Sequence, residues 1–475
     1  MKRSNKTKIV ATLGPASADK SVMKRMVEEG VNVFRLNFSH GTHDDHRRSM
    51  QLIRELNDEN HWNVATLADL QGPKLRIGTV EEGTVLEDGQ KFTITTDEGP
   101  GNKVQAYLNY EQIARDVKAG ERILIDDGKI ILRILNTNGL NKVETEVIQG
   151  GPLKSRKGVN LPNTRVSLPC LTPKDLEDLQ VALQGGVEWI GLSFVRSAND
   201  VLELRQKIRD HGYSALIISK IEKPEAVMDF DEILSVTDGV MVARGDLGVE
   251  VPMQNVPLIQ KEIVNKAHQA SKPVIIATQM MESMIQNLSP TRAEVNDVAN
   301  SVLDGADAMM LSGETSVGEH PVEVIKAMSM IIQQVESSGQ IKVKTDHPPT
   351  VRNERYVTDS ICYNASKIAD QIGAKAILSM TFSGYTAFKI SSHRPRTNIL
   401  VFTANRSILN TLSLLWGVRG FFYDKMVSTD ETFDDIKKMV IANGIVEKGD
   451  FMVKIASMPI KDKGMTNMLK IGIAE

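Results

Sequence analysis

The chain has 475 residues, of which 41% are hydrophobic and 25% are charged. A chain of this length should divide into roughly two to four domains, and its composition is ordinary for a soluble globular enzyme. The 57 basic and 60 acidic residues leave a formal net charge of -3. No overall field therefore attracts nucleic acid or an anionic membrane, and any anion must bind at a local site.

The first ten residues, MKRSNKTKIV, are basic but lack the apolar stretch of a signal peptide. No apolar run is long enough to span a membrane, so we expect a cytoplasmic protein. The two cysteines, Cys170 and Cys362, lie far apart and form no CxxC pair. This spacing argues against a disulfide framework and a zinc site, and we expect both cysteines to be buried small apolar residues.

Eight short apolar runs, each ending in polar residues and followed by a helix-length amphipathic stretch, dominate the sequence. They are IVATLGP (9 to 15), VFRLNFSHG (33 to 41), VATLADL (64 to 70), VEWIGLSF (187 to 194), LIISKIE (216 to 222), GVMVARGDLG (239 to 248), VIIATQM (274 to 280) and ADAMMLSGE (306 to 314). Continuous apolar strands alternating with helices predict an α/β fold with a closed (β/α)8 barrel. A doubly wound open sheet is the alternative, but its glycine-rich fingerprint is missing after the first run.

The barrel is expected to comprise residues 1–72 and 169–340, with an insertion at 73–168. The insertion carries short or alternating runs (FTITTD, VQAYLNY, RILIDDGKIILRIL and KVETEVI), which predict a small all-β domain. It leaves at Gly72-Pro73 and returns at Leu168-Pro169, both on the strand-end side, so it could close over a site as a lid. After a linker at 340–356, residues 341–475 alternate helix and strand again and predict a C-terminal α/β domain.

The carboxyl ends of barrel strands hold the reacting groups in this architecture, so the polar residues there are candidates. They are Arg35, Asn37, Ser39, His40, Asp69, Ser193, Lys220, Glu222, Asp246, Thr278, Ser312 and Glu314. One charged residue at a strand end is more often structural than catalytic. Two cations and several carboxylates on one rim favour a functional site.

Lys220 and Glu222 are two residues apart on a strand and therefore point the same way. A local ion pair is the simplest interpretation, but their apolar flanks call for a further partner or a metal ion. Glu222 and Asp246 could hold magnesium, and the ARGDLG turn (243 to 248) could cradle an anion through its backbone N–H groups. This set suits phosphoryl transfer, and it suits a metal-enolate lyase or aldolase equally well.

In order and spacing, RLNFSHG, GPKLRIG, KSRKGVNLP, ISKIE, MVARGDLG, ATQMMESM, PTRAEVNDVANSVLDGADAMML and SGET resemble pyruvate kinase. The resemblance covers nearly the whole chain. It implies a homotetramer that transfers the phosphoryl group of phosphoenolpyruvate to ADP, giving pyruvate and ATP. A catalytically dead paralogue that senses metabolites would be favoured by loss of the lysine or a carboxylate, and all three are present.

The resemblance also implies roles for single residues. Arg35 would hold the transferring phosphoryl group, and Lys220 would neutralise its oxygens. Glu222 and Asp246 would bind Mg²⁺ or Mn²⁺, the N–H groups of Ala243, Arg244 and Gly245 would grip the substrate carboxylate, and Thr278 would help deliver a proton. Asn37, Phe38, Ser39, His40, Arg76 and Lys157 would contact the nucleotide.

The stretch DLQGPKLRIG (69 to 78) places Lys74 and Arg76 shortly after Asp69. In the potassium-dependent members, the corresponding stretch resembles DTKGPEIR, with potassium on oxygens matching Asn37, Ser39, Asp69 and the carbonyl of Leu70. Lys74 replaces the glutamate there. We expect its ammonium to occupy this pocket, neutralise Asp69 and remove the requirement for potassium, although a solvated lysine at a hinge is the alternative.

The C-terminal domain offers one further candidate site. The small-residue loop from Thr381 to Thr386, with Ser383 and Gly384, precedes a predicted helix and could bind an anion. An ordinary helix cap and turn is the alternative. The family often binds a sugar phosphate at such a loop, so the resemblance implies a sugar-phosphate or nucleotide effector.

Overall fold

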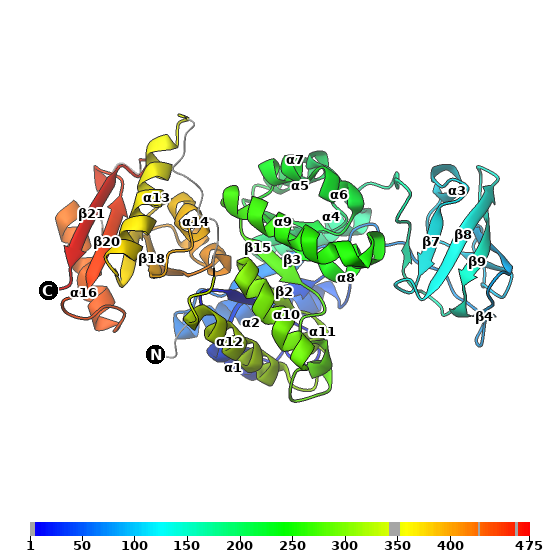
Figure 1. Ribbon diagram of the computed structural model, residues 1–475, viewed down its shortest axis with the longest axis horizontal. Helices are drawn as coiled ribbons and strands as arrows, with labels where there is room; N and C mark the ends of the chain where they lie inside the picture. The colour runs from blue at the N-terminus through cyan, green and yellow to red at the C-terminus, as the bar shows by residue number, and fades with distance from the viewer. Residues whose placement is uncertain (1–4, 342–351, 426–427, 461–463) are drawn as a thin grey trace.

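The computed structural model describes residues 5–341, 352–425, 428–460 and 464–475. Figure 1 shows three bodies in a row, with the barrel in the middle, the inserted β domain at one end and the C-terminal domain at the other. Residues 342–351 of the predicted linker lie outside the described residues. The predicted domain order is thus visible, while the residues at which one domain passes into the next stay a prediction.

The central body is a closed barrel of parallel strands in the order β1-β16-β15-β14-β13-β12-β3-β2. The strands are β1 (Lys8–Thr12), β2 (Val31–Asn37), β3 (Ala65–Asp69), β12 (Trp189–Leu192), β13 (Leu216–Ile221), β14 (Gly239–Ala243), β15 (Val274–Ala277) and β16 (Ala308–Leu311). Each of the eight predicted runs overlaps one of them. The (β/α)8 prediction is confirmed, and the open-sheet alternative is wrong.

Helices surround the barrel and bury one face against the strands. They are α1 (Lys20–Glu29), α2 (His43–Asn60), α4 (Pro173–Gln184), α5 (Ala198–Asp210), α6 (Pro224–Met228), α7 (Phe230–Val236), α8 (Arg244–Glu250), α9 (Val256–Gln269), α10 (Arg292–Asp304), α11 (Gly313–Ser316) and α12 (Pro321–Ser337), with 3-10 turns at Met253–Asn255 and Glu282–Ile285. Capping boxes begin α2 at Thr42, α4 at Thr172 and α10 at Thr291. Such boxes satisfy the free N–H groups of a first turn, so these helix starts are set locally by the sequence.

The inserted domain, called the lid below, is a curled β half-barrel. Its larger sheet has the order β11-β7-β8-β9-β5-β6, and β10 pairs with β4. The elements are β4 (Val85–Leu86), β5 (Lys91–Thr95), β6 (Gln105–Tyr107), α3 (Ile113–Asp116), β7 (Arg122–Ile125), β8 (Ile130–Thr137), β9 (Lys142–Gln149), β10 (Gly151–Pro152) and β11 (Val159–Asn160). Alternate side chains of β8 and β9 are buried, as their sequence pattern predicts.

The C-terminal domain is a five-stranded sheet in the order β19-β18-β17-β20-β21, in which only the edge strand β21 runs antiparallel to its neighbour. Its elements are α13 (Tyr356–Gln371), β17 (Ala376–Met380), α14 (Tyr385–Ser392), β18 (Asn398–Thr403), α15 (Arg406–Leu409), a 3-10 turn at Thr411–Leu414, β19 (Val418–Phe422), α16 (Thr429–Ala442), β20 (Phe451–Ala456) and β21 (Met468–Ile473). The predicted mixed α/β domain is confirmed.

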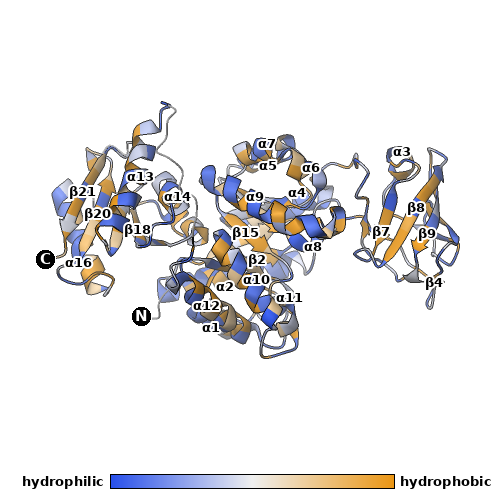
Figure 2. Ribbon diagram, viewed as in Figure 1, coloured by the Kyte–Doolittle hydropathy of each residue, from blue (hydrophilic) through white to orange (hydrophobic). Residues whose placement is uncertain are grey.

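Hydropathy follows the layers of the structure. Figure 2 shows apolar barrel strands inside helices whose outer faces are hydrophilic. Val10, Met241 and Ile275 belong to the core cluster inside the barrel, and Leu414 of the C-terminal domain packs into the same cluster. The C-terminal domain therefore closes the end of the barrel at which the strands begin, opposite their carboxyl ends. Within the described part of the chain, no helix combines the length and apolar character needed to cross a membrane.

A buried ion pair joins the C-terminal domain to this closed end. The Arg394 guanidinium lies 2.8 Å from Asp307 Oδ2 and donates to the Gly305 carbonyl at 2.9 Å. It also donates to His268 Nε2 at 2.7 Å, which places His268 in its neutral form with Nε2 as the acceptor. Burial, followed by the charge of Arg394, lowers the pKa of His268 to about 3.

Candidate active site

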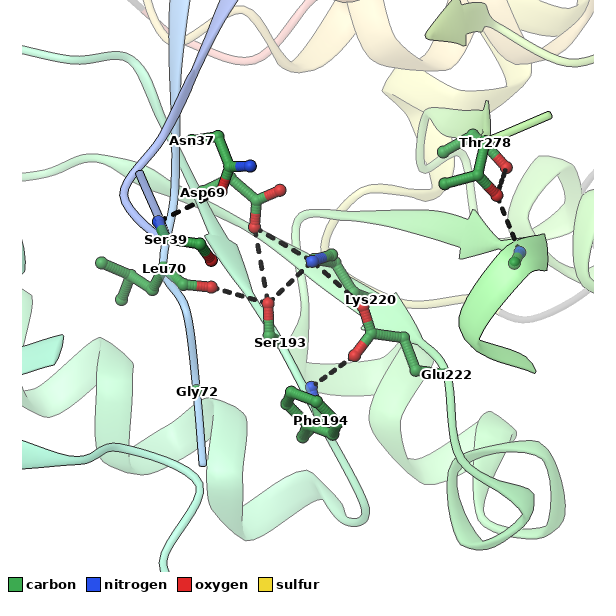
Figure 3. Close-up of polar contacts among 12 residues, drawn as sticks. Asn37, Ser39, Asp69, Leu70, Gly72, Ser193, Phe194, Lys220, Glu222 and Thr278 are labelled. Atoms are coloured by element: carbon green, nitrogen blue, oxygen red, sulfur yellow. Dashed lines mark hydrogen bonds and ion pairs between the residues drawn. The ribbon is translucent and has the colours of Figure 1, made fainter. Parts of the chain in front are cut away.

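Four charged side chains meet at the carboxyl ends of the barrel strands, and Figure 3 shows three of them, Asp69, Lys220 and Glu222. Arg35 lies on β2, Asp69 ends β3, Lys220 lies near the end of β13 and Glu222 follows it. Asn37 pairs with Asp69 in the register of β2 and β3, and Ser193 follows β12, which lies between β3 and β13. Strand order thus collects residues that are far apart in the sequence, as the strand-end rule predicts.

Asp69 is the centre of this cluster. Its Oδ2 accepts from Arg35 Nε at 2.7 Å, and its Oδ1 lies 3.1 Å from Lys220 Nζ. Burial alone would raise the pKa of this carboxyl, but the charges of Lys220 and Arg35 outweigh it and hold the pKa below its usual value. Asp69 is therefore an ionised, doubly paired carboxylate.

The Lys220 ammonium has three N–H donors and three close acceptors. Its Nζ lies 2.7 Å from Ser193 Oγ, 3.0 Å from Glu222 Oε1 and 3.1 Å from Asp69 Oδ1. Burial would lower the pKa of Lys220, but the two carboxylates raise it above its usual value. Lys220 is thus a permanent cation at the barrel mouth, which suits neutralisation of a charged group and excludes a role as a base near neutral pH.

Glu222 and Asp246 form the candidate metal site. Glu222 is 2% exposed, and its second oxygen, Oε2, accepts from the Phe194 N–H at 2.9 Å. Burial, the largest influence, raises the pKa of Glu222, and the negative charge of Asp246 raises it further. The positive charge of Lys220 acts in the opposite direction without outweighing them. No group of three or more metal-binding side chains occurs in the described part of the chain. Two adjacent carboxylates nevertheless fit Mg²⁺, which keeps several waters and binds substrate oxygens.

The ARGDLG stretch forms a short helix rather than the turn we predicted. The helix α8 begins at Arg244, whose guanidinium pairs with both Asp297 oxygens at 2.7 Å. The Gly245 N–H already donates to Thr278 Oγ1 at 2.7 Å. Thr278 has a positive φ of 69°, an uncommon backbone conformation for threonine that aims its hydroxyl at this helix start.

The candidate nucleotide residues fall into two groups. Asn37, Phe38, Ser39 and His40 form the loop after β2, where Asn37 Oδ1 accepts from the Ser39 N–H at 3.2 Å. Arg76 and Lys157 lie at the lid, and Lys157 Nζ pairs with Asp126 Oδ1 at 3.0 Å. Burial and then the charges of Lys74 and Arg76 lower the pKa of His40, so these cations lie near the loop. The two groups of candidate nucleotide residues therefore come from the barrel and from the lid.

Comparisons with known proteins agree over the whole chain. Residues 4–325 match the family model of the pyruvate kinase barrel domain, and residues 359–472 match that of the pyruvate kinase alpha/beta domain. The pyruvate kinase of Corynebacterium glutamicum is 45% identical over 468 residues, which cover 98% of this chain and 97% of the relative. The chain belongs to the pyruvate kinase family.

Further relatives support the same assignment. The Mycobacterium tuberculosis pyruvate kinase is 42% identical over 98% of this chain and 97% of its own length. A solved structure of a pyruvate kinase from Cryptosporidium parvum superposes with a TM-score of 0.91 at 34% identity, covering 99% of this chain and 96% of that one. The chain is therefore a phosphotransferase with pyruvate kinase activity, and the lyase and dead-paralogue alternatives fall away.

Lys74 does not lie where the resemblance to the pyruvate kinase family led us to expect it. Its side chain is exposed, and none of the ion pairs of the described residues joins it to Asp69. Arg35 and Lys220 neutralise Asp69 instead, because both come from strands that surround it. Filling of the potassium pocket by Lys74 is thus not seen in this structure and stays a prediction.

Two positioning side chains were missed by the sequence analysis of this pyruvate kinase, those of Thr12 and Glu250. Thr12 Oγ1 accepts from Arg35 Nη1 at 3.0 Å, and Glu250 contacts Lys223. Thr12 ends β1, so the strand-end rule that selected Ser193, whose Oγ donates to the Leu70 carbonyl at 2.6 Å, could have assigned it as well. Glu250 lies at the far end of a helix and gave no signal in the sequence.

The candidate effector loop of the C-terminal domain precedes α14. Thr381 Oγ1 accepts from the Gly384 N–H at 3.1 Å and Ser383 Oγ accepts from the Tyr385 N–H at 3.4 Å. The Thr386 hydroxyl is buried and lies 3.0 Å from Ser379 Oγ. These contacts lie at the start of α14, where Gly384 is the N-cap, and a cavity of about 130 Å³ lies beside them. An effector at this loop remains a prediction.

Proposed function

We propose that Arg35 and Lys220 bind and neutralise the phosphoryl group as it passes from phosphoenolpyruvate to ADP. The observation that carries this proposal is the buried ammonium of Lys220, held by three acceptors at the strand ends. A positioned cation in a dry site stabilises charge more strongly than one in water, because it needs no reorganisation when the charge develops. To contact the substrate, Lys220 must exchange one of its three contacts for a phosphoryl oxygen.

Glu222 and Asp246 would hold the divalent cation, Mg²⁺ or Mn²⁺. When bound, it would offset the negative charge of the phosphoryl group and the enolate. Glu222 Oε1 lies 3.0 Å from Lys220 Nζ, so the cation would bind beside the lysine that faces the phosphoryl group. The presence of a second carboxylate whose charge reaches Glu222 supports the assignment.

The start of α8 would bind the carboxylate of phosphoenolpyruvate through the N–H groups of Ala243, Arg244 and Gly245. Gly245 would then exchange its bond to Thr278 Oγ1 for the substrate. The Thr278 hydroxyl, released by this exchange, would help to deliver a proton to the enolate carbon. Asn37, Phe38, Ser39 and His40 from the barrel, with Arg76 and Lys157 from the lid, would bind the nucleotide phosphates.

We further propose that this enzyme needs no potassium. Lys74 replaces the glutamate of the potassium-dependent pattern, and its side chain makes no ion pair with any described residue that would hold it elsewhere. Lys74 follows Gly72, which has a positive φ of 69°, so it lies on the linker that moves if the lid closes. An ammonium and a potassium ion about 4 Å from Asp69 would each contribute on the order of 4 kcal/mol at an effective dielectric near 20.

The assay for this proposal uses sodium or tetramethylammonium salts at matched ionic strength. We expect full turnover of phosphoenolpyruvate and ADP to ATP without potassium. Lys74→Glu should lose activity and regain part of it with added potassium, whereas Lys103→Glu, on the exposed surface of the lid, serves as the matched charge control. Strong activation of the wild type by potassium would contradict the proposal.

The remaining assignments are proposals of the same kind. The family resemblance supports a cytoplasmic homotetramer and a sugar-phosphate or nucleotide effector at Thr381, Ser383, Gly384 and Thr386. The proposed domains are 1–72 with 169–340, 73–168, and 341–475. Titration of sugar phosphates against the saturation curve for phosphoenolpyruvate tests the effector site.

A further inference from the structure

Glu250 is a buried carboxylate at the end of α8 that contacts two other parts of the molecule. Its Oε1 lies 2.6 Å from Lys223 Nζ and accepts from Asn160 Nδ2, on lid strand β11, at 2.7 Å. The side chains of Lys223 and Glu250 are only 12% and 1% exposed. Glu250 Oε2 is buried and has no hydrogen-bond partner among the described residues. Such a pair is costly to bury, so its position calls for an explanation.

The two partners are neighbours of the two candidate metal ligands. Lys223 directly follows Glu222, and Glu250 lies four residues after Asp246 on the same helix. Residues four apart lie on one face of a helix, one turn apart. The Lys223–Glu250 ion pair therefore links the chain that carries Glu222 to the helix that carries Asp246.

This link opposes the repulsion between the two carboxylates of the candidate metal site. Glu222 and Asp246 are both acidic, and the charge of Asp246 acts directly on Glu222. Without a cation between them, the two carboxylates repel one another and favour a movement of α8 away from β13. The ion pair between Lys223 and Glu250 supplies an attraction that opposes this repulsion, because it joins the same two segments of the chain.

We propose that Lys223 and Glu250 are positioning residues that hold Glu222 and Asp246 at the spacing required by the divalent cation before it binds. We call this ion pair the brace. Because Asn160 bonds to the same Glu250 oxygen, the lid contacts the brace directly. The inference rests on the proposed assignment of Glu222 and Asp246 as metal ligands.

The test measures Mn²⁺ binding to the full-length enzyme without substrates, by calorimetry and by the electron paramagnetic resonance signal of free Mn²⁺. Lys223→Met and Glu250→Gln should each weaken binding about tenfold, the usual size for residues that orient metal ligands. The double variant should bind no more weakly than either single variant, because one contact is lost in all three. Lys223→Arg should retain most of the affinity.

Controls separate the brace from general loss of stability. Arg205→Met breaks the Arg205–Asp238 ion pair, 2.8 Å long and distant in the fold, and should lower the melting temperature without changing Mn²⁺ affinity. Asn160→Ala should change the affinity less than threefold, since the lid contact does not join the carboxylates. If Asn160→Ala weakens binding as much as Lys223→Met, the lid contact and not the brace orients the site.

The experiment gives different results if the brace proposal is wrong and if the metal-ligand assignment is wrong. Glu222→Gln should itself weaken Mn²⁺ binding by removing an anionic ligand. If Glu222→Gln binds normally, the ligand assignment is wrong. If Glu222→Gln binds weakly while Lys223→Met and Glu250→Gln bind like the wild type, the assignment holds and the brace is wrong. Glu250→Gln preserves the shape of the side chain, so it remains informative if Lys223→Met folds poorly.

Discussion

The two ends of the barrel each contain buried charges, but the charges are arranged differently. At the closed end, one cation, Arg394, pairs with one carboxylate, Asp307, and His268 beside them is neutral. At the strand ends, two cations face three carboxylates. They are Arg35 and Lys220 against Asp69, Glu222 and Asp246.

This difference separates a structural pair from a binding site. A balanced buried pair gains nothing from another ion and holds two domains together. A cluster with one negative charge in excess attracts a cation, and its contacts can be exchanged when ligands arrive. Buried charge by itself therefore does not mark an active site, whereas an uncompensated charge at the strand ends does.

The largest expected effect comes from breaking the balanced end. Arg394→Met leaves Asp307 buried without its partner, which typically costs about 3 to 5 kcal/mol. We expect a large fall in the free energy of unfolding, measured by urea denaturation, with turnover per folded molecule nearly unchanged. The double variant Arg394→Met with Asp307→Leu should recover part of this loss. A normal unfolding curve for Arg394→Met would show that the pair is not a structural link.

The second prediction removes a cation from the unbalanced end. Lys220→Met should lower turnover about a hundredfold or more, because one preorganised charge is lost where negative charge develops. The melting temperature should change much less than turnover does, and circular dichroism should show an intact fold. Near-normal turnover of the pure variant would remove Lys220 from the mechanism.

The smallest effect concerns the pH dependence of the closed end. The folded pKa of His268, about 3, lies below its usual 6.5, so the unfolded chain binds an extra proton between these values. The stability contributed by neutral His268 is fully present above pH 6.5 and is lost as the pH falls toward 3, by about 1.4 kcal/mol per pH unit. His268→Gln, whose side-chain oxygen can accept from Arg394, should remove this dependence.

The comparison for His268 is the change in unfolding free energy between pH 7 and pH 5.5 in the wild type and in His268→Gln. Other titrating groups are shared and cancel in the difference. We expect the wild type to lose about 1.4 kcal/mol more than the variant over this interval. Equal losses would mean that folding does not lower the pKa of His268.

The strands of the barrel could be predicted because each is an apolar run buried on both faces, such as VIIA in β15. The meeting of Arg35, Asp69, Lys220 and Glu222 followed from the rule that parallel strands end on one side. These conclusions needed only the local pattern and the topology of a closed barrel. The main site residues were therefore accessible from the sequence.

The contacts of individual side chains were less predictable. The resemblance suggested Lys74 as a partner of Asp69, whereas the partners seen in the structure are Arg35 on β2 and Lys220 on β13. The Lys223–Glu250 pair joins residues 27 positions apart through the placement of a short helix, which no periodicity encodes. Side-chain partners across different elements depend on tertiary packing, and sequence pattern alone does not fix them.

The position of the lid within the chain has a consequence for how the protein folds. The neighbouring barrel strands β3 and β12 pair through Ala68 and Ile190, yet the whole lid sequence lies between them. Closing a long flexible loop costs entropy before its contacts form, whereas a lid that has already folded holds its two ends close together. We expect the lid to acquire structure first during synthesis, so that the barrel can then close as though the inserted segment were a short connection.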